Sequence, residues 1–238
     1  MNSICVIGMG YVGLPLAIEF SKHYNVIGFD IDKKKINKLK NNIDTTGELN
    51  KEILKRNKVF FTSENKYLEK NNIYIVTVPT PLYKNKRPDL RLLIKACKLI
   101  SKFLKKNDIV IFESTVYPGV TEDICVPALK IYNNLKYNKD FFCGYSPERI
   151  NPGDKKYNIS NIKKITSGSN QRITNYIDNL YKKIIKAGTY KVSSIKIAET
   201  AKVIENCQRD INIAFVNELS ILFHKMNLDS EEVLEAAG

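Results

Sequence analysis

Short apolar runs alternate with helix-like patterns over the first 194 residues of the chain. Each run is nearly continuous in β-branched or aromatic residues, as expected for strands that are buried on both faces. The expected strands are Ile4–Ile7, Val26–Phe29, Val59–Phe61, Ile73–Val78, Ile109–Phe112 and Phe141–Cys143, with weaker ones at Lys164–Thr166 and Tyr190–Val192. Alternation of strands with helices predicts an α/β fold built on a doubly wound parallel sheet.

Helical periodicity separates these apolar runs. The expected helices are Val12–Lys22, Lys33–Lys40, Lys51–Arg56, Asp89–Lys105 and Gln171–Lys186. In the fourth of them, apolar residues recur at the spacing of one buried helix face, and Asp89 is in the right place to be the N-cap.

The alternation ends after residue 194, where one long helix is predicted from Ile195 to about Met226. It contains no Pro or Gly, and apolar residues recur at Ile197, Ala201, Ile204, Ile211, Phe215, Leu219 and Leu222. A short helix over Glu231–Ala236, capped by Asp229 or Ser230, is expected to follow. We therefore expect one domain over residues 1–194, and over residues 195–238 only the beginning of a central domain.

Composition narrows the class of protein without pointing to a polyanion as partner. The 238 residues are 43% hydrophobic and 26% charged, which is typical of a soluble globular protein. The net charge of +13 comes from lysines spread over many segments beside asparagines, so we attribute it to composition. We expect no nucleic-acid or membrane partner, since neither a basic stripe with interleaved aromatics nor an apolar run of ~20 residues occurs.

The cysteines and the N-terminus favour a cytoplasmic protein. Five cysteines, an odd number without a CxxC pair, fit neither a secreted disulfide framework nor a zinc site, so no metal is expected. The chain enters its first strand at once, with no recognisable signal peptide ahead of it.

A glycine pattern follows the first strand and opens the first helix. Gly8, Gly10 and Gly13 fit G-x-G-x-x-G, and Asp30 ends the second strand 22 residues after Gly8. Gly8 permits the tight turn, Gly10 admits a pyrophosphate close to the backbone, and Gly13 lets the helix pack on the strand. The helix N-terminus attracts the phosphates. This context predicts a Rossmann-type domain that binds a dinucleotide.

The acidic residue also predicts which dinucleotide is bound. The Asp30 carboxylate can accept hydrogen bonds from both ribose hydroxyls and repels a 2′-phosphate, so we predict NAD over NADP. Lys33, Lys34 and Lys35 soften this expectation because a cation there would tolerate the phosphate.

Further motifs go beyond a generic dinucleotide-binding domain. They are Gly8-Met9-Gly10-Tyr11-Val12-Gly13-Leu14-Pro15, Val78-Pro79-Thr80-Pro81, Glu113-Ser114-Thr115-Val116-Tyr117-Pro118-Gly119 and Ser146-Pro147-Glu148-Arg149-Ile150-Asn151-Pro152-Gly153. In this order they resemble the nucleotide-sugar 6-dehydrogenase family, which includes UDP-glucose, GDP-mannose and UDP-N-acetylhexosamine dehydrogenases. The resemblance covers essentially the whole chain and is strongest to the UDP-N-acetylhexosamine branch.

The resemblance implies an oxidoreductase that serves polysaccharide precursor biosynthesis. Such enzymes oxidise the sugar C6 alcohol to a uronate with two NAD, through an aldehyde held on a cysteine and a thioester that water hydrolyses. It implies NAD contacts from Gly8, Gly10, Tyr11, Val12, Gly13, Asp30, Lys35, Thr80 and Thr115. The substrate, a UDP-N-acetylhexosamine, would meet Glu148, Arg149, Ile150, Lys202, Asn206 and Arg209.

Four of these residues are expected to be catalytic: Thr115 and Glu148 with the water, and Lys202 and Asn206 with the reacting oxygen. Lys202 and Asn206 lie four residues apart, so they share one helix face and could stabilise an oxyanion. By spacing alone, Lys202 and Arg209 would instead be read as a solvated helix face.

The nucleophilic cysteine of the family has no counterpart in this chain. In the family it lies downstream of the long helix, in a loop beyond Gly238 of this sequence. Cys5 and Cys143 belong to expected strands, Cys97 and Cys125 to expected helices, and Cys207 points away from Asn206, so none is assigned as nucleophile. We therefore expect an incomplete unit that binds NAD but does not complete the oxidation alone.

Two other hypotheses remain open at this point. A β-hydroxyacid or 6-phosphogluconate type of dehydrogenase would share the Rossmann domain, the long helix and a Lys/Asn pair without needing a cysteine. A non-catalytic NAD-binding module would use the apolar residues of the long helix as a dimer seam. A homodimer through this helix is also expected under the first hypothesis.

Overall fold

The computed structural model describes residues 3–149 and 159–237, which fall into two compact units, Met1–Glu199 and Thr200–Gly238. The first unit contains one eight-stranded sheet with the strand order β3-β2-β1-β4-β5-β6-β7-β8. Its strands are β1 (Ser3–Ile7), β2 (Asn25–Phe29), β3 (Phe60–Thr62), β4 (Ile73–Val76), β5 (Ile109–Phe112), β6 (Phe142–Tyr145), β7 (Lys164–Gly168) and β8 (Thr189–Lys191). Every expected strand is present, with bounds within about two residues of the prediction.

Helices connect these strands. They are α1 (Gly13–Ser21), α2 (Lys33–Lys40), α3 (Lys51–Arg56), α4 (Arg91–Ser101), α5 (Val126–Leu129) and α6 (Gln171–Lys182), with a 3-10 helix η1 (Asn65–Lys70) and a π-helical turn η2 (Thr121–Cys125). The bounds of α2 and α3 agree with the expected ones, whereas the sequence pattern did not indicate η1 and η2 as separate elements.

The sheet departs from the expected all-parallel arrangement at one edge. Strands β1 to β6 pair in parallel, but β7 is antiparallel to β6, with Gly144 opposite Gly168, and β8 is parallel to β7. The chain leaves β6 at the carboxyl edge of the sheet and enters β7 at the same edge, so β7 runs back. An apolar run has the same pattern in either direction, which is why the sequence did not predict this reversal.

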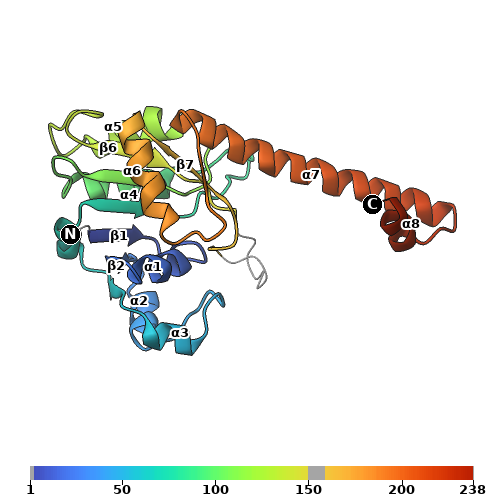
Figure 1. Cartoon of the computed structure of the whole chain (residues 1–238), viewed down its shortest axis with the longest axis horizontal. Helices are drawn as coiled ribbons and strands as arrows, with labels where there is room; N and C mark the ends of the chain where they lie inside the picture. The colour runs from blue at the N-terminus through green and yellow to red at the C-terminus, as the bar shows by residue number, and fades with distance from the viewer. Residues whose placement is uncertain (1–2, 150–158, 238) are drawn as a thin grey trace. The chain divides into compact units, whose positions relative to one another are not determined.

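Two helical layers bury the sheet. Helices α1 and α6 cover the same face of the sheet (Figure 1). Phe20 of α1 and Tyr181 of α6 pack together there, with their ring centroids 5.4 Å apart. The core on this side includes Ile4, Val6 and Ile111. Alternate strand residues point to the opposite face, where α4 lies against β4 and α5. The sheet is therefore covered on both sides, which explains its continuous apolar strands.

The start of α4 corrects one expectation. Asp89 does not cap this helix, whose N-cap is Leu90 without a side-chain hydrogen bond. The Asp89 carboxylate instead accepts from the Arg91 backbone N–H at 3.0 Å and from its guanidinium at 2.6 to 3.0 Å. This bidentate pair lowers the pKa of Asp89 and holds the side chain beside Arg91, one residue too early to serve as the cap.

The long helix α7 (Ile195–Lys225) and the short helix α8 (Ser230–Ala237) end the chain, close to the expected bounds. Asp229 caps α8 by accepting from the N–H groups of Glu231 and Glu232. In the second unit the apolar residues of α7 are exposed; they include Ile204, Ile211, Phe215 and Leu222.

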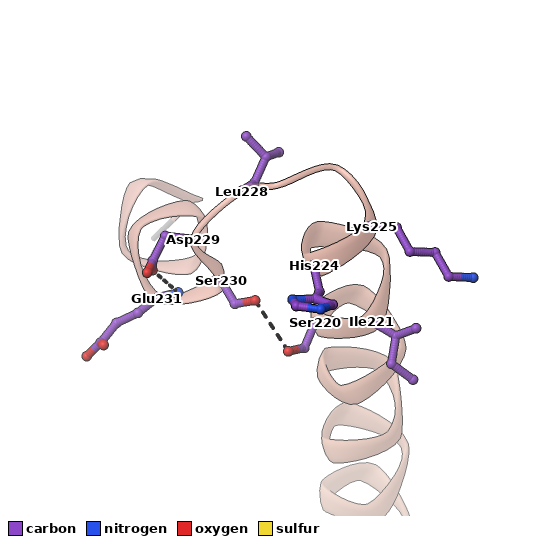
Figure 2. A pocket seen from close by; sticks show the side chains of 8 residues that line it. All are labelled: Ser220, Ile221, His224, Lys225, Leu228, Asp229, Ser230 and Glu231. Atoms are coloured by element: carbon purple, nitrogen blue, oxygen red, sulfur yellow. Dashed lines mark hydrogen bonds between the residues drawn. The ribbon is translucent and has the colours of Figure 1, made fainter.

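An open pocket of about 590 Å³ lies between the end of α7 and α8 (Figure 2). The hydroxyls of Ser220 and Ser230 approach to 3.3 Å across it. None of its lining residues is among the expected site residues. Over the residues that the structure describes, no helix has both the length and the apolar character needed to cross a bilayer.

Candidate functional site

The turn between β1 and α1 is shaped by its three glycines. Gly8 has φ +101°, and a side chain on it would press against the backbone of Thr77. A Cβ on Gly13 would overlap the Gly8 carbonyl oxygen and the Thr77 hydroxyl, whereas a Cβ on Gly10 would meet no heavy atom within 4 Å. Gly8 and Gly13 are therefore required by the fold itself. Gly10 faces open space, as a position next to a ligand does.

The start of α1 fits the pyrophosphate that the glycine motif implies. Val12 is the N-cap, and no side chain in the described part of the chain caps this helix. The first bond that closes the turn runs from the Leu14 N–H to the Gly10 carbonyl at 3.0 Å. The preceding N–H groups, including those of Tyr11 and Gly13, are thus left for an anion. This set of donors matches a dinucleotide.

Asp30 stands directly behind this turn. Its Oδ2 accepts from the Met9 N–H and from Lys35 Nζ, both at 2.9 Å, and its Oδ1 accepts from the Asp32 N–H at 2.9 Å. A carboxylate has about four acceptor sites, so one remains for a ribose hydroxyl. Lys35 is partly exposed, which leaves it able to move aside for a second one.

The loops after β4 and β5 are tied together at the same edge of the sheet. The Thr80 hydroxyl donates to the Thr115 carbonyl at 2.6 Å, and the Ser114 hydroxyl donates to the Val78 carbonyl at 2.6 Å. Because β1, β4 and β5 are parallel, their carboxyl ends bring Thr80 and Thr115 to the edge that carries the glycine turn. Open α/β sheets bind their ligands at this edge.

A buried cluster of charged side chains connects the carboxyl ends of β5 and β6 with the start of β7. Lys164, the first residue of β7, donates to Glu113 Oε2 at 2.6 Å and to Glu148 Oε2 at 3.0 Å. The Tyr181 hydroxyl on α6 donates to the other oxygen of Glu113. Glu148, a predicted catalytic residue, thus pairs with Lys164, which also binds Glu113; the sequence interpretation had placed neither Lys164 nor Glu113 in the site.

The charge states in this cluster follow from burial and mutual attraction. Burial raises the pKa of Glu113 to about 7, although Lys164 acts in the opposite direction. Burial alone would lower the pKa of Lys164, but the carboxylates of Glu113 and Glu148 raise it above its usual value. The lysine therefore stays an ammonium at neutral pH, while Glu113 is close to its midpoint.

Glu199, near the start of α7, is a further buried carboxylate at this edge. Its oxygens accept from the Gly119 N–H at 2.6 Å and from the N–H and hydroxyl of Thr121 at 2.9 and 2.7 Å. Three donors satisfy a charge that is fully shielded from solvent. Glu199 thereby fixes the turn that follows the Thr115 loop to the first residues of α7.

The remaining predicted residues are not all brought together by the structure. Lys202, Asn206 and Arg209 belong to the second unit, where Lys202 pairs with Glu205 at 3.2 Å and Arg209 donates to Asn206 at 2.6 Å. They share one side of α7, as the spacing predicts. Arg149 follows Glu148 directly and its N–H donates to that carboxylate at 2.6 Å.

Ile150 lies outside the described residues. The cysteines behave as expected for structural thiols: Cys5, Cys97, Cys125 and Cys143 are buried, and Cys207 is exposed on α7. Burial raises the pKa of Cys5, Cys97 and Cys143, which keeps them protonated.

Sequence reasoning missed four members of the site: Lys164, Glu113, Tyr181 and Glu199. One signal was present for the first of them, since Lys164 opens the apolar run of β7 and a charged residue at the edge of a buried strand needs a partner. Nothing in the sequence alone indicated that α6 would supply Tyr181.

Comparison with known proteins gives two matching family models. Residues 2–185 match the NAD binding domain of the UDP-glucose/GDP-mannose dehydrogenase family, and residues 196–238 match the central domain of that family. The chain is 56% identical over 236 residues to UDP-N-acetyl-D-glucosamine 6-dehydrogenase of Pseudomonas aeruginosa, which covers 99% of this chain and 56% of that protein. It is 49% identical to Protein CapL of Staphylococcus aureus, over 100% of this chain and 56% of that protein.

A solved structure shares the fold. The UDP-D-ManNAc dehydrogenase of Pyrococcus horikoshii superposes with a TM-score of 0.90 at 32% identity, covering 99% of this chain and 57% of that one. The chain spans slightly more than half the length of the curated relatives that it matches.

Proposed function

The chain belongs to the UDP-glucose/GDP-mannose dehydrogenase family, whose NAD-binding domain it contains, and we propose that it forms the NAD-binding part of a UDP-N-acetylhexosamine 6-dehydrogenase. The reaction would oxidise the sugar C6 alcohol to a uronate in polysaccharide precursor biosynthesis. Membership in this family favours this hypothesis over a β-hydroxyacid type of dehydrogenase. The observation that carries the proposal is the turn at Gly8–Gly13 with Asp30 behind it, within a domain that matches the family over residues 2–185.

Each predicted residue of the first unit would contact a different part of NAD or the reacting water. The N–H groups at the start of α1 would bind the pyrophosphate, and Asp30 would accept from the adenosine ribose. NAD held by these residues would supply the hydride acceptor for oxidation of the sugar alcohol. Thr80 and Thr115, linked at 2.6 Å, would line the nicotinamide end, and Glu148 would orient or deprotonate the water.

The remaining predicted catalytic residues, Lys202 and Asn206, belong to the second unit. Lys202 and Asn206 would stabilise the oxyanion at C6, and Arg209 and Arg149 would meet the substrate together with Ile150. The separation of the NAD-binding domain at residue 194 from a central domain that begins at residue 195 is likewise a proposal. The separate family matches over residues 2–185 and 196–238 support it.

The chain is expected to bind NAD at least about tenfold more tightly than NADP, a difference of ~1.4 kcal/mol. The Asp30 carboxylate accepts from the ribose hydroxyls of NAD but repels a 2′-phosphate, and Lys35 offsets only part of this repulsion. Isothermal titration calorimetry with each dinucleotide measures both dissociation constants. Equal affinities would contradict the assignment of Asp30, and no detectable NAD binding would overturn the proposed function.

A charge-neutralising variant tests the residue itself. Asp30→Asn should bring the NADP and NAD affinities to within about threefold of each other, because the repulsion is removed and Lys35 remains. Asp32→Asn is the matched control. Asp32 lies two residues after Asp30, is exposed, and caps α2 with its side chain. If the control changed the preference as much as Asp30→Asn did, a general loss of negative charge would explain the result.

The chain is also expected to associate as a homodimer through α7. The second unit exposes apolar side chains along α7, and packing against a second copy would bury them away from solvent. Sedimentation equilibrium should give about twice the mass of the 238-residue chain. Phe215→Glu should return it to the monomer, whereas Lys225→Glu, at the end of the same helix, should leave the dimer intact. A monomeric wild-type chain would contradict this expectation.

A further inference from the structure

One buried lysine holds two carboxylates together at the edge where the proposed site lies. Lys164 Nζ is 2.6 Å from Glu113 Oε2 and 3.0 Å from Glu148 Oε2. The side chains of Lys164, Glu113 and Glu148 are 5%, 0% and 10% exposed, so water screens these contacts little. Tyr181 closes the cluster, with its hydroxyl on Glu113 and its ring centroid 5.6 Å from Nζ.

A purely packing role does not explain such an arrangement. Burying three charged groups is costly, and apolar residues of similar size often stabilise a core as well or better. The contacts made to the two oxygens of Glu148 indicate a different role. Lys164 donates to Oε2 of Glu148, while the N–H of Arg149 donates to Oε1 at 2.6 Å. Both oxygens are held, so the plane of the Glu148 carboxylate is fixed.

The strand reversal is what makes this contact available. Glu113 follows β5 and Glu148 follows β6, and the two strands are parallel and adjacent. Since β7 begins at the carboxyl edge of the sheet, its first residue reaches both loops at once. A parallel β7 would have placed Lys164 at the opposite edge.

We propose that Lys164 is a positioning residue, which orients the Glu148 carboxylate and divides its charge between Glu148 and Glu113. The inference rests on the function proposed above for Glu148 and deepens it. Neither Lys164 nor Glu113 touches substrate in this scheme; both act through Glu148. The sharing implies that the proton on Glu113 controls how strongly the ammonium is drawn to Glu148.

The titratable groups around Lys164 make this sharing depend on pH near neutrality. Glu113 after β5 and Glu148 after β6 contact the lysine directly, Tyr181 on α6 contacts Glu113, and Tyr145 on β6 interacts electrostatically with Glu113. Burial raises the pKa of both tyrosines, so neither phenol ionises near pH 7. Burial also raises the pKa of Glu113 to about 7, so Glu113 is the member that takes up a proton there. Once Glu113 is protonated, Glu148 is the only one of the two that still attracts the Lys164 ammonium by opposite charge.

Carboxyl NMR tests the proposal without needing turnover. The chain is labelled with glutamate carrying ¹³C at the side-chain carboxyl, and the Glu113 and Glu148 signals are assigned by their loss in Glu113→Gln and Glu148→Gln. In the wild type, the Glu113 signal should titrate with a midpoint of about 7, and the Glu148 signal should shift in step with it. In Lys164→Met, the Glu113 midpoint should rise by about 1–3 pH units, and the Glu148 signal should move away from its wild-type position.

Two variants separate positioning from a general effect of substitution. Lys164→Arg should restore the Glu148 signal in large part, because a guanidinium also donates to both carboxylates. Lys163→Met removes the exposed neighbouring lysine and should leave both signals unchanged. The proposal is overturned if the Glu148 signal of Lys164→Met superimposes on that of the wild type from about pH 5 to about pH 9.

A second measurement decides the matter if Lys164→Met does not fold. Glu113→Gln keeps one oxygen that can accept from Lys164, while its amide N–H can donate to the Tyr181 hydroxyl. The amide does not titrate, so in this variant the Glu148 signal should lose its step near pH 7. A persisting step would overturn the proposal. Calorimetric titration with NAD on the same samples keeps the two ideas distinguishable. Loss of NAD binding in the wild type rejects the proposed function, whereas NAD binding with an unmoved Glu148 signal rejects only the role of Lys164.

Discussion

Gly10→Val is expected to weaken NAD binding by about a hundredfold or more and to leave the unfolding free energy within about 1 kcal/mol of the wild-type value. A Cβ at Gly10 meets no heavy atom within 4 Å, so we expect a substitution there to leave the packing of the folded chain largely unchanged. The same space is where a pyrophosphate would approach the N–H groups at the start of α1. Losing about two charge-assisted hydrogen bonds, each worth ~1.5–3 kcal/mol, accounts for the expected change.

Calorimetry with NAD and urea unfolding measure the two quantities on the same preparation. Gly10→Ala is the graded comparison, and its smaller side chain should weaken binding less than valine does. An unchanged dissociation constant in Gly10→Val would mean that the pyrophosphate does not lie against this turn. A large loss of stability would mean that Gly10 supports the fold, contrary to its surroundings.

Gly13→Ala is expected to destabilise the fold by about 3 kcal/mol or more and to lower the melting temperature by roughly 6–12 °C. Its new methyl group would overlap the Gly8 carbonyl and the Thr77 hydroxyl, which itself donates to the carbonyls of Gly8 and Ile7 at 2.8 and 3.1 Å. Relief of the overlap requires α1 to move away from β1, where its buried residues fill the core.

The control for this variant is Gly10→Ala, which introduces the same methyl group three residues earlier in the same turn. It should unfold at nearly the wild-type urea concentration. Equal stability of the two variants would show that α1 does not pack on β1 as closely as described. Substitutions at Gly10 and Gly13 thus distinguish, within one turn, the glycine needed for NAD binding from the glycine needed for folding.

The parts of the fold that the sequence predicted are those that depend on local pattern. Strands buried on both faces are continuous apolar runs, and this is why every strand of the sheet was found from its residues alone. Helices α2 and α3 have the bounds that helical periodicity predicted, and the structure shows that Asp32 and Asn50, immediately before them, cap them. The glycine turn was recognised because each glycine has a separate steric reason.

The parts that were missed depend on contacts between distant segments. The direction of β7 follows from where the chain re-enters the sheet, which no local pattern records. Lys164 pairs with Glu113, which is 51 residues earlier, and a lysine read by itself is assigned to the surface. Asp89 is not the N-cap because α4 begins at Arg91 with Leu90 as its cap, and the Asp89 carboxylate binds the backbone N–H and guanidinium of Arg91.

The two ends of the strand order bear on how this protein avoids unwanted self-association. Both outermost strands, β3 and β8, are only three residues long, and β8 ends in Lys191. Short, charged margins offer few backbone groups for another chain to pair with, a common defence against amyloid-like stacking. Pairing between the sheet edges of two copies is therefore disfavoured. Solubility problems during expression should accordingly be countered by shielding α7 rather than by altering the strands.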